Sequence, residues 1–74
     1  MSEFIENFKN ALGREYFEGK EITGSTILSE LPIWDSLAVV AVVAMLDLEY
    51  EKRSFAAEIT KCKTLNDLYK ISVS

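Results

Sequence analysis

The amino-acid sequence predicts a small all-α bundle of four helices, three main and one short, with a long loop after the first. Apolar residues recur at three- and four-residue spacing in separate segments, as the buried face of a helix requires. The 74-residue chain holds one cysteine and no histidine, so a disulfide and a zinc site are not expected to staple it. Its length predicts a single domain over residues 1–74, held by its own apolar core.

The first helix is expected over about residues 3–13. Ser2 is a good N-cap candidate, and Gly13 is a natural stop, although Tyr16 and Phe17 are able to extend the apolar face by one turn. The residues predicted to form its buried face are Phe4, Ile5, Phe8, Ala11 and Leu12.

The stretch from Gly19 to Asp35 has no sustained period, but it is rich in apolar residues. An apolar loop of this length is expected to lie against the bundle, and loops so long are commonly functional. A short helical turn is predicted between Ser29 and Pro32.

The longest helix is expected from Ser36 to about Glu51, with the carboxylate of Asp35 as its N-cap. Its valines would also suit a strand, but fifteen residues without a turn signal are too long for one. Because its apolar residues go nearly all round, we expect a central helix with neighbours on several sides. Asp47, Glu49 and Glu51 mark its exposed end.

Two further helices are predicted after a polar break at 52–54. A short one is expected around Phe55, Ala56 and Ile59, and a last one begins after Thr64. Asp67 lies three residues after Thr64, the spacing of a capping box. The predicted buried face of the last helix is Leu65, Leu68, Tyr69 and Ile71.

The net charge of −4 is unevenly divided along the chain. Residues 1–51 hold ten acidic and three basic residues and carry −7, whereas residues 52–74 carry +3. An acidic chain is a poor candidate for a nucleic-acid-binding protein. The acidic part would steer basic partners toward the loop before Ser36, or it would simply serve solubility. No signal peptide or membrane-spanning run is present, which predicts a cytoplasmic protein.

Most catalytic arrangements are excluded by residue type. Without histidine, Ser36 has no imidazole base, and nothing supports a pairing with Lys52 or Lys61. Neither a glycine-rich phosphate loop nor a metal-ligand cluster is present. Flanking lysines would lower the pKa of Cys62, but a lone free cysteine is expected to pack as a small apolar residue. From the residues alone, two roles stay open for Ser36: it is either a helix-start residue or an attachment point.

Three stretches resemble the acyl carrier protein family. They are Asp35-Ser36-Leu37 at the start of the long helix, the approach Leu28-Ser29-Glu30-Leu31, and the ending Lys63-Thr64-Leu65-Asn66-Asp67-Leu68. The resemblance covers nearly the whole chain and implies a bundle of acyl-carrier type. It also implies a 4′-phosphopantetheine arm on Ser36 that holds acyl groups as thioesters. Asp35 and Leu37 would complete that cofactor site, with Asp35 meeting a basic residue of the transferase.

Partner contacts are expected near the same serine, with Trp34, Val40 and Asp47 as candidates. Trp34 is also expected to pack against the loop and Leu37. Ala38 and Ala41 stand where many carriers have acidic residues, which suggests a more apolar docking face. Ser54 stands where carriers usually bury an apolar residue, with Phe55 as its substitute. Residues that would line a cavity for the acyl chain are Val39, Val43, Leu46, Phe55, Ile59 and Ile71.

The sequence thus predicts a stand-alone monomeric carrier, not an enzyme, for fatty-acid, polyketide, peptide or surface-polysaccharide synthesis. Its expected partners are a phosphopantetheinyl transferase, an acyl- or aminoacyl-loading ligase, and an acyltransferase or synthase. Two alternatives stay open. One is an aminoacyl or peptidyl carrier with the same arm and different cargo. The other is an unmodified helical interaction module that binds a protein through Trp34 and the apolar helix.

Overall fold

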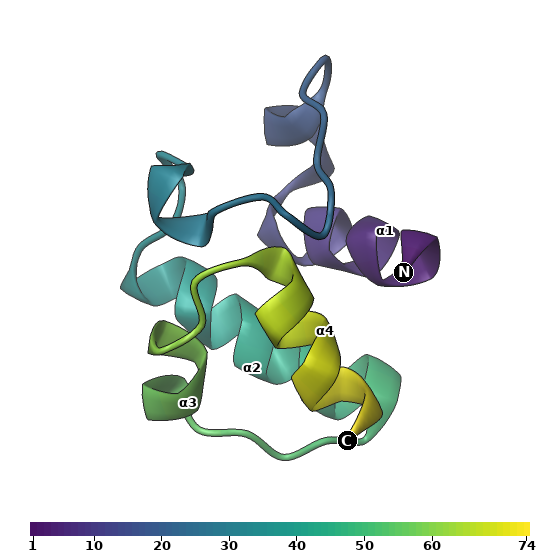
Figure 1. Cartoon of the computed structure of the whole chain (residues 1–74), viewed down its shortest axis with the longest axis vertical. Helices are drawn as coiled ribbons and strands as arrows, with labels where there is room; N and C mark the ends of the chain where they lie inside the picture. Colours follow the sequence, from purple (N-terminus) through teal and green to yellow (C-terminus); the bar gives the residue numbers. More distant parts are fainter.

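The computed structural model describes residues 1–74 and is mostly helical, without strands (Figure 1). Four α-helices follow one another as α1 (Ser2–Leu12), α2 (Ser36–Tyr50), α3 (Ala56–Thr60) and α4 (Leu65–Val73). Two single 3-10 turns, η1 (Arg14–Phe17) and η2 (Leu28–Glu30), lie in the connection between α1 and α2. The predicted all-α class and the order of three main helices and one short helix are confirmed.

Helix α1 begins one residue earlier than predicted, and Ser2 does not cap it. The amide of Ile5 donates to the carbonyl of Met1 at 3.0 Å, so Met1 is the cap and Ser2 lies inside the first turn. Gly13 ends the helix, as predicted, because its φ of 108° is open to glycine but not to other residues. Tyr16 and Phe17 belong to the separate turn η1 and do not extend α1.

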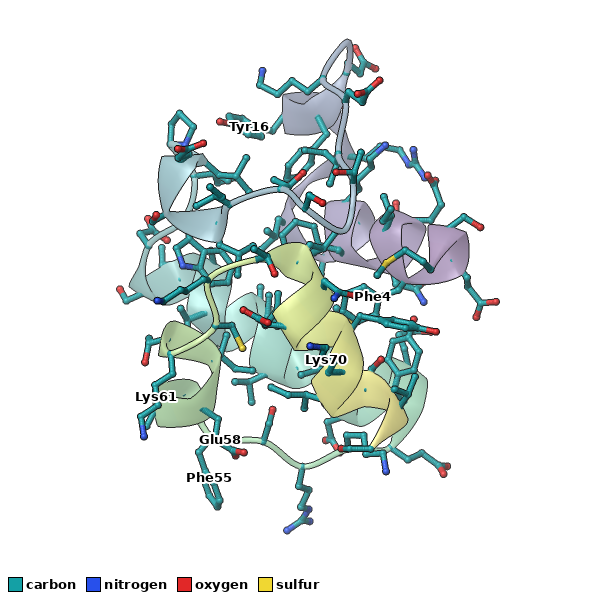
Figure 2. All side chains as sticks on the ribbon, in the orientation of Figure 1. Phe4, Tyr16, Phe55, Glu58, Lys61 and Lys70 are labelled. Atoms are coloured by element: carbon teal, nitrogen blue, oxygen red, sulfur yellow. The ribbon has the colours of Figure 1, made fainter.

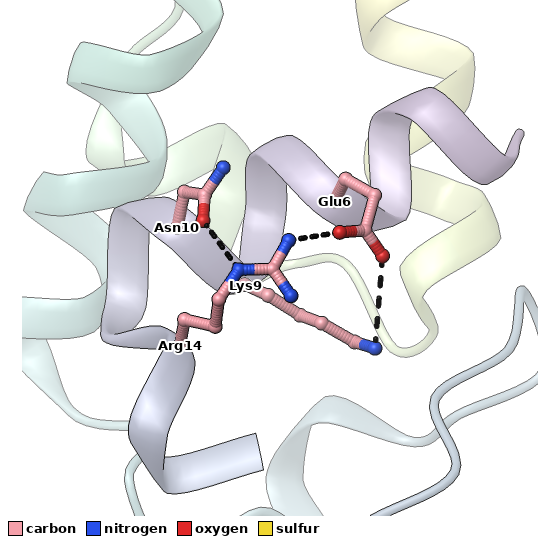
Figure 3. Close-up of polar contacts among 4 residues, drawn as sticks. All are labelled: Glu6, Lys9, Asn10 and Arg14. Carbon is pink, nitrogen blue, oxygen red and sulfur yellow. Dashed lines mark hydrogen bonds and ion pairs between the residues drawn. The ribbon is translucent and has the colours of Figure 1, made fainter. Parts of the chain in front are cut away.

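A polar network on the outer face of α1 joins it to η1 (Figure 3). The Arg14 guanidinium donates to the Glu6 carboxylate, and its Nε donates to Asn10 Oδ1 at 3.0 Å. Lys9 Nζ lies 3.9 Å from the same carboxylate. The hydrogen bond from Arg14 lowers the pKa of Glu6 below its ordinary value. The network fixes the turn at Gly13 from outside, while Phe17 is buried on the inside.

The long loop is joined to the start of α4 by backbone hydrogen bonds. The amide of Leu28 donates to Lys63 O at 2.9 Å, and the amide of Leu65 donates to Thr26 O at 3.0 Å. A third bond runs from the amide of Asn66 to Gly24 O at 2.8 Å. Leu28 is also fully buried in the core. The loop therefore lies against the bundle, as predicted, and its helical turn begins just before the expected position.

Helix α2 contacts each of the other three helices, so it is central, as predicted. Its buried side is formed by Ala38, Val39, Val42, Met45 and Leu46. The opposite side stays exposed, and its apolar residues are described with the site below. The helix ends where Glu51 adopts φ 54° and the amide of Lys52 donates to Leu46 O at 3.0 Å.

Phe55 is not part of the core, contrary to the prediction. It is the N-cap residue of α3, its side chain is 75% exposed, and it points away from the molecule (Figure 2). The extended backbone at Phe55 turns the ring outward, and only Ile59 of the short helix is buried. Ser54 instead directs its hydroxyl inward, where the oxygen is buried without a hydrogen-bond partner. Phe55 therefore does not substitute for the apolar residue expected at this place.

The core lies between α2 and the other helices. Phe4 of α1 meets Tyr50 of α2 and Tyr69 of α4, with ring centroids 5.6 and 5.5 Å apart. Thr64 and Asp67 form the predicted capping box of α4, since Thr64 Oγ1 accepts from the Asp67 amide at 3.3 Å and Asp67 Oδ2 accepts from the Thr64 amide at 3.2 Å. In the predicted face of α4, Leu65 and Leu68 are fully buried, whereas Tyr69 and Ile71 are half-buried.

Candidate functional site

The candidate site is the start of α2. Asp35 is the N-cap, and its Oδ1 accepts from the amide of Ala38 at 3.0 Å. Its carbonyl accepts the first helical bond from Val39 at 3.0 Å. Ser36 is the first helical residue and is exposed, as is Asp35. The predicted cap and the predicted helix start are both confirmed.

Two backbone donors lie beside the Ser36 hydroxyl. The amides of Ser36 and Leu37 find no acceptor within the chain, because the Asp35 carboxylate accepts from Ala38 instead. Unpaired amides and the helix dipole give this end a partial positive charge that favours a phosphate group. The site therefore combines an exposed hydroxyl with donors for a phosphate oxygen.

Trp34 holds the chain in place just before the site. Its ring is half-buried and lies 6.4 Å from the ring of Phe8 in α1. Its amide donates to Leu31 O at 2.9 Å, which closes a turn immediately before Asp35. Trp34 was expected to pack against the loop and Leu37, but its ring contacts α1 instead, and Leu37 is 77% exposed. Trp34 thus supports the loop from inside more than it offers a surface to a partner.

An exposed apolar stripe follows the site along α2. We call Leu37, Val40, Ala44 and Leu48 the α2 stripe, since they lie at i, i+3, i+7 and i+11. Val40 is 60% exposed, and Leu37 and Leu48 are each 77% exposed. The sequence indicated Val40 but missed Ala44 and Leu48, because a helix that is apolar nearly all round has no periodicity to distinguish its outer face.

Acidic residues border both ends of the stripe. Asp35 lies at its start, and Asp47, Glu49 and Glu51 are exposed at its far end. Helix α2 carries no basic residue, and both ion pairs of the structure are formed by Glu6. The carboxylates at the end of α2 therefore form no ion pair within the chain. The surface around the candidate serine is apolar with an acidic border.

Cys62 lies apart from this site. Its half-buried thiol donates to Glu58 O at 3.5 Å and packs against the core. Burial raises the pKa of this thiol, and the Asp67 and Glu58 carboxylates raise it further. The possible lowering of its pKa by the neighbouring lysines is thus wrong, and the predicted packing as a small apolar residue is present. No three His, Cys, Asp or Glu side chains converge as metal ligands.

Comparison of the chain with protein-family models, with curated proteins and with solved structures yields no significant match. None of its helices has both the length and the apolar character that crossing a membrane demands.

Proposed function

We propose that this protein is an acyl carrier whose arm is attached to the hydroxyl of Ser36, rather than an enzyme. The observation that carries the proposal is the exposed Ser36 at the first position of α2, directly after the Asp35 cap and beside two unpaired amides. An acceptor serine needs exposure and no base of its own, because a transferase brings the catalytic groups. The resemblance in the loop and in the α4 capping box supports the same function.

A phosphodiester on Ser36 fits the local charges. The Ser36 and Leu37 amides are donors for a phosphate oxygen, and the helix dipole would stabilise the negative charge by about 0.3–1 kcal/mol. In the attachment, the serine oxygen forms a bond to the β-phosphorus of coenzyme A and the pyrophosphate bond breaks. Adenosine 3′,5′-bisphosphate leaves, and the hydroxyl proton passes to a base of the transferase. A bound 4′-phosphopantetheine would supply the thiol that holds acyl groups as thioesters.

The α2 stripe is the proposed docking face for partner enzymes. Its exposed leucines and Val40 suit an apolar surface, and the acids at 47, 49 and 51 suit basic residues at the rim of that surface. A transferase, a loading ligase and an acyltransferase or synthase would each use it in turn. Asp35, exposed beside Ser36, would meet a basic residue of the transferase.

Intact-mass spectrometry after incubation with a phosphopantetheinyl transferase and coenzyme A tests the proposal. We expect one phosphopantetheine addition on the wild-type chain and none on Ser36→Ala. Ser29→Ala, which changes an exposed serine in η2, is the matched control and should be modified like the wild type. An unmodified wild type, or an equal addition on Ser36→Ala, contradicts the proposal.

The same wild-type and variant proteins also distinguish two alternative functions. An aminoacyl or peptidyl carrier would also gain the arm, but the holo-protein would be charged by an aminoacyl-loading ligase and not by an acyl-loading one. An unmodified interaction module is favoured by the exposed α2 stripe alone. It predicts no mass addition on any variant, together with partner binding that is lost in Leu48→Gln and kept in Ser36→Ala.

A further inference from the structure

Phe55 is the one strongly exposed aromatic side chain of the protein, and the proposed carrier function makes no use of it. It is the N-cap residue of α3, and Ala56 and Ala57 in the first turn of that helix are exposed beside it. We call Phe55, Ala56 and Ala57 the α3 knob. Figure 2 shows that Phe55 and Lys61 both project outward from the region of α3. The bundle therefore leaves a small apolar surface uncovered at this corner.

The α3 knob has a basic border. Arg53 lies two residues before Phe55, Lys61 follows at the C-terminal end of α3, and both are exposed. Both ion pairs of the structure are formed by Glu6, so neither cation is paired within the chain. The one carboxylate of α3, that of Glu58, accepts from the Phe55 amide at 3.0 Å and is thus engaged at the cap. The knob is apolar with free cations on two sides.

The inner side of α3 is already filled. Ile59 of α3 and Leu46 of α2 are fully buried in one continuous core. Val39, Leu46 and Ile59 line none of the four main pockets, so the cavity expected among them is absent. Because no space remains on the inner side, the α3 knob can be covered only by another molecule.

A groove between α1 and α2 offers an apolar surface of matching size. Two adjoining pockets, with volumes of about 310 and 420 Å³, share Ala11 and Ala41 as walls and form one trough, here called the α1–α2 groove. Ala44 and Leu48 line its larger half. Small residues on both helices leave room for a flat ring, and mostly apolar walls favour an aromatic side chain over a charged one.

Carboxylates stand at both ends of this groove. Asp35 lines the smaller half and Glu49 the larger half, and Asp47 and Glu51 are exposed at the same end of α2 as Glu49. None of these acids forms an ion pair within the chain. An apolar knob with a basic border and an apolar groove with an acidic border are complementary in both shape and charge. Every molecule carries both surfaces, so a second copy of this chain is the partner that fits.

We propose that Phe55 of one copy inserts into the α1–α2 groove of a second copy, with Arg53 and Lys61 facing the acids at its larger end. The contact joins two different surfaces, so each copy can provide a knob and receive one. A single ring makes a small interface of the weak, transient class. We therefore expect monomers at about 10 μM and association at about 1 mM. The contact needs neither Ser36 nor an arm, so its failure would leave the proposed function untouched.

An NMR concentration series on the unmodified wild type is the first test. Between about 0.01 and about 1 mM, we expect the amide signals of Ala41, Ala44 and Leu48 to shift together with those of Phe55 and Ala56. Raising the NaCl concentration from about 0.05 to about 0.5 M should reduce these shifts, because salt screens the charges at the border. Signals that stay constant at every concentration, or shifts that leave out the groove, overturn the proposal.

Two variants that each lose one surface provide a sharper test. Phe55→Ser removes the ring and places a good N-cap residue at the start of α3, so the fold is retained. Ala41→Leu fills the middle of the groove and keeps the ring. Each variant alone should associate at least about tenfold more weakly than the wild type. Mixed together they should associate again, and unlabelled Ala41→Leu should shift the groove signals of labelled Phe55→Ser.

Val73→Ser is the matched control, because it removes a different exposed apolar side chain, at the end of α4. This variant should associate like the wild type. Association that persists in Phe55→Ser, or a mixture of the two folded variants that stays monomeric, contradicts the proposal. If Ala41→Leu does not fold, the wild-type series and Phe55→Ser still decide the question.

Discussion

Asp67 shows how one carboxylate can hold the start of a helix in place. Its Oδ2 accepts from the amides of Lys63 and Thr64 at 2.9 and 3.2 Å, and its own amide donates back to Thr64 Oγ1. These bonds, that from Lys63 first, lower the pKa of Asp67 below its ordinary value of 3.8. The residue was predicted as the capping-box partner, but the additional bond from Lys63 depends on the turn before α4 and has no signature in the sequence.

The lowered pKa of Asp67 predicts acid sensitivity. Because folding favours the ionised form, the stabilisation is fully present above about pH 4 and is lost as the pH falls through the lowered value. We expect Asp67→Asn to be less stable than the wild type at neutral pH and to lose stability less steeply below pH 4. Urea unfolding over a pH series measures both. Identical acid slopes for the two proteins would contradict this assignment, and Asn66→Asp, which adds a carboxylate outside the box, serves as a control.

A substitution at Ser54 is expected to raise the stability of the protein, opposite to the effect of Asp67→Asn. The hydroxyl oxygen of Ser54 is buried and has no hydrogen-bond partner, a situation that costs about 1–3 kcal/mol. Ser54→Ala removes the unsatisfied group, so we expect the free energy of unfolding to rise by about 1 kcal/mol. Ser25→Ala, at an exposed serine of the long loop, should change it by less than about 0.5 kcal/mol. Chemical denaturation of the wild type and the two variants measures these free energies. A destabilised Ser54→Ala would mean that the hydroxyl has a hydrogen-bond partner in solution.

At the scale of elements, sequence patterns predicted the helices better than their faces. The Asp35 cap, the Gly13 stop and the Thr64 capping box depend on neighbours within four residues, so local chemistry was sufficient to place them. The exposed side of α2 and the outward turn of Phe55 depend on which helix packs where. That information is tertiary, and an apolar stretch such as 37–48 does not contain it. For the same reason Ser36 could be predicted as a candidate from sequence, whereas Ala44 and Leu48 of the α2 stripe could not.

The C-terminal end of α2 provides a test at this scale. Glu51 has φ 54°, the left-handed conformation in which a side chain is strained and glycine is not. We expect Glu51→Gly to stabilise the protein by about 1 kcal/mol. Glu49→Gly, two residues earlier within the helix, should destabilise it by a similar amount. Thermal unfolding of the pair measures the contrast, and a loss of stability in both variants would argue against the left-handed cap.

At the scale of the whole molecule, the loop before Ser36 depends on the start of α4. The bonds from Leu28, Leu65 and Asn66 join residues 24–28 to residues 63–66, and Trp34 adds a contact with α1 through Phe8. The loop before Ser36 is thus held from two sides, although it contains only one turn of regular structure. These few contacts hold the long connection in place before α2.

These contacts predict an unusual pattern of amide hydrogen exchange. The Leu28 and Leu65 amides donate across the junction, so they should exchange only when α4 and the loop separate. We expect their protection to match that of core amides in α2 and to exceed that of the Ser25 amide in the same loop. Hydrogen exchange followed by NMR provides the measurement. Rapid exchange at Leu28 would show that the loop opens independently of the bundle.

The junction between the loop and α4 also has a consequence for the order of events during synthesis. Lys63 is synthesised 35 residues after Leu28, and until it has emerged from the ribosome the amide of Leu28 lacks its acceptor. The loop before Ser36 would accordingly reach its final shape only after residues 63–66 have emerged. A nascent chain that stops short of these residues would then be a poor substrate for the proposed modification of Ser36.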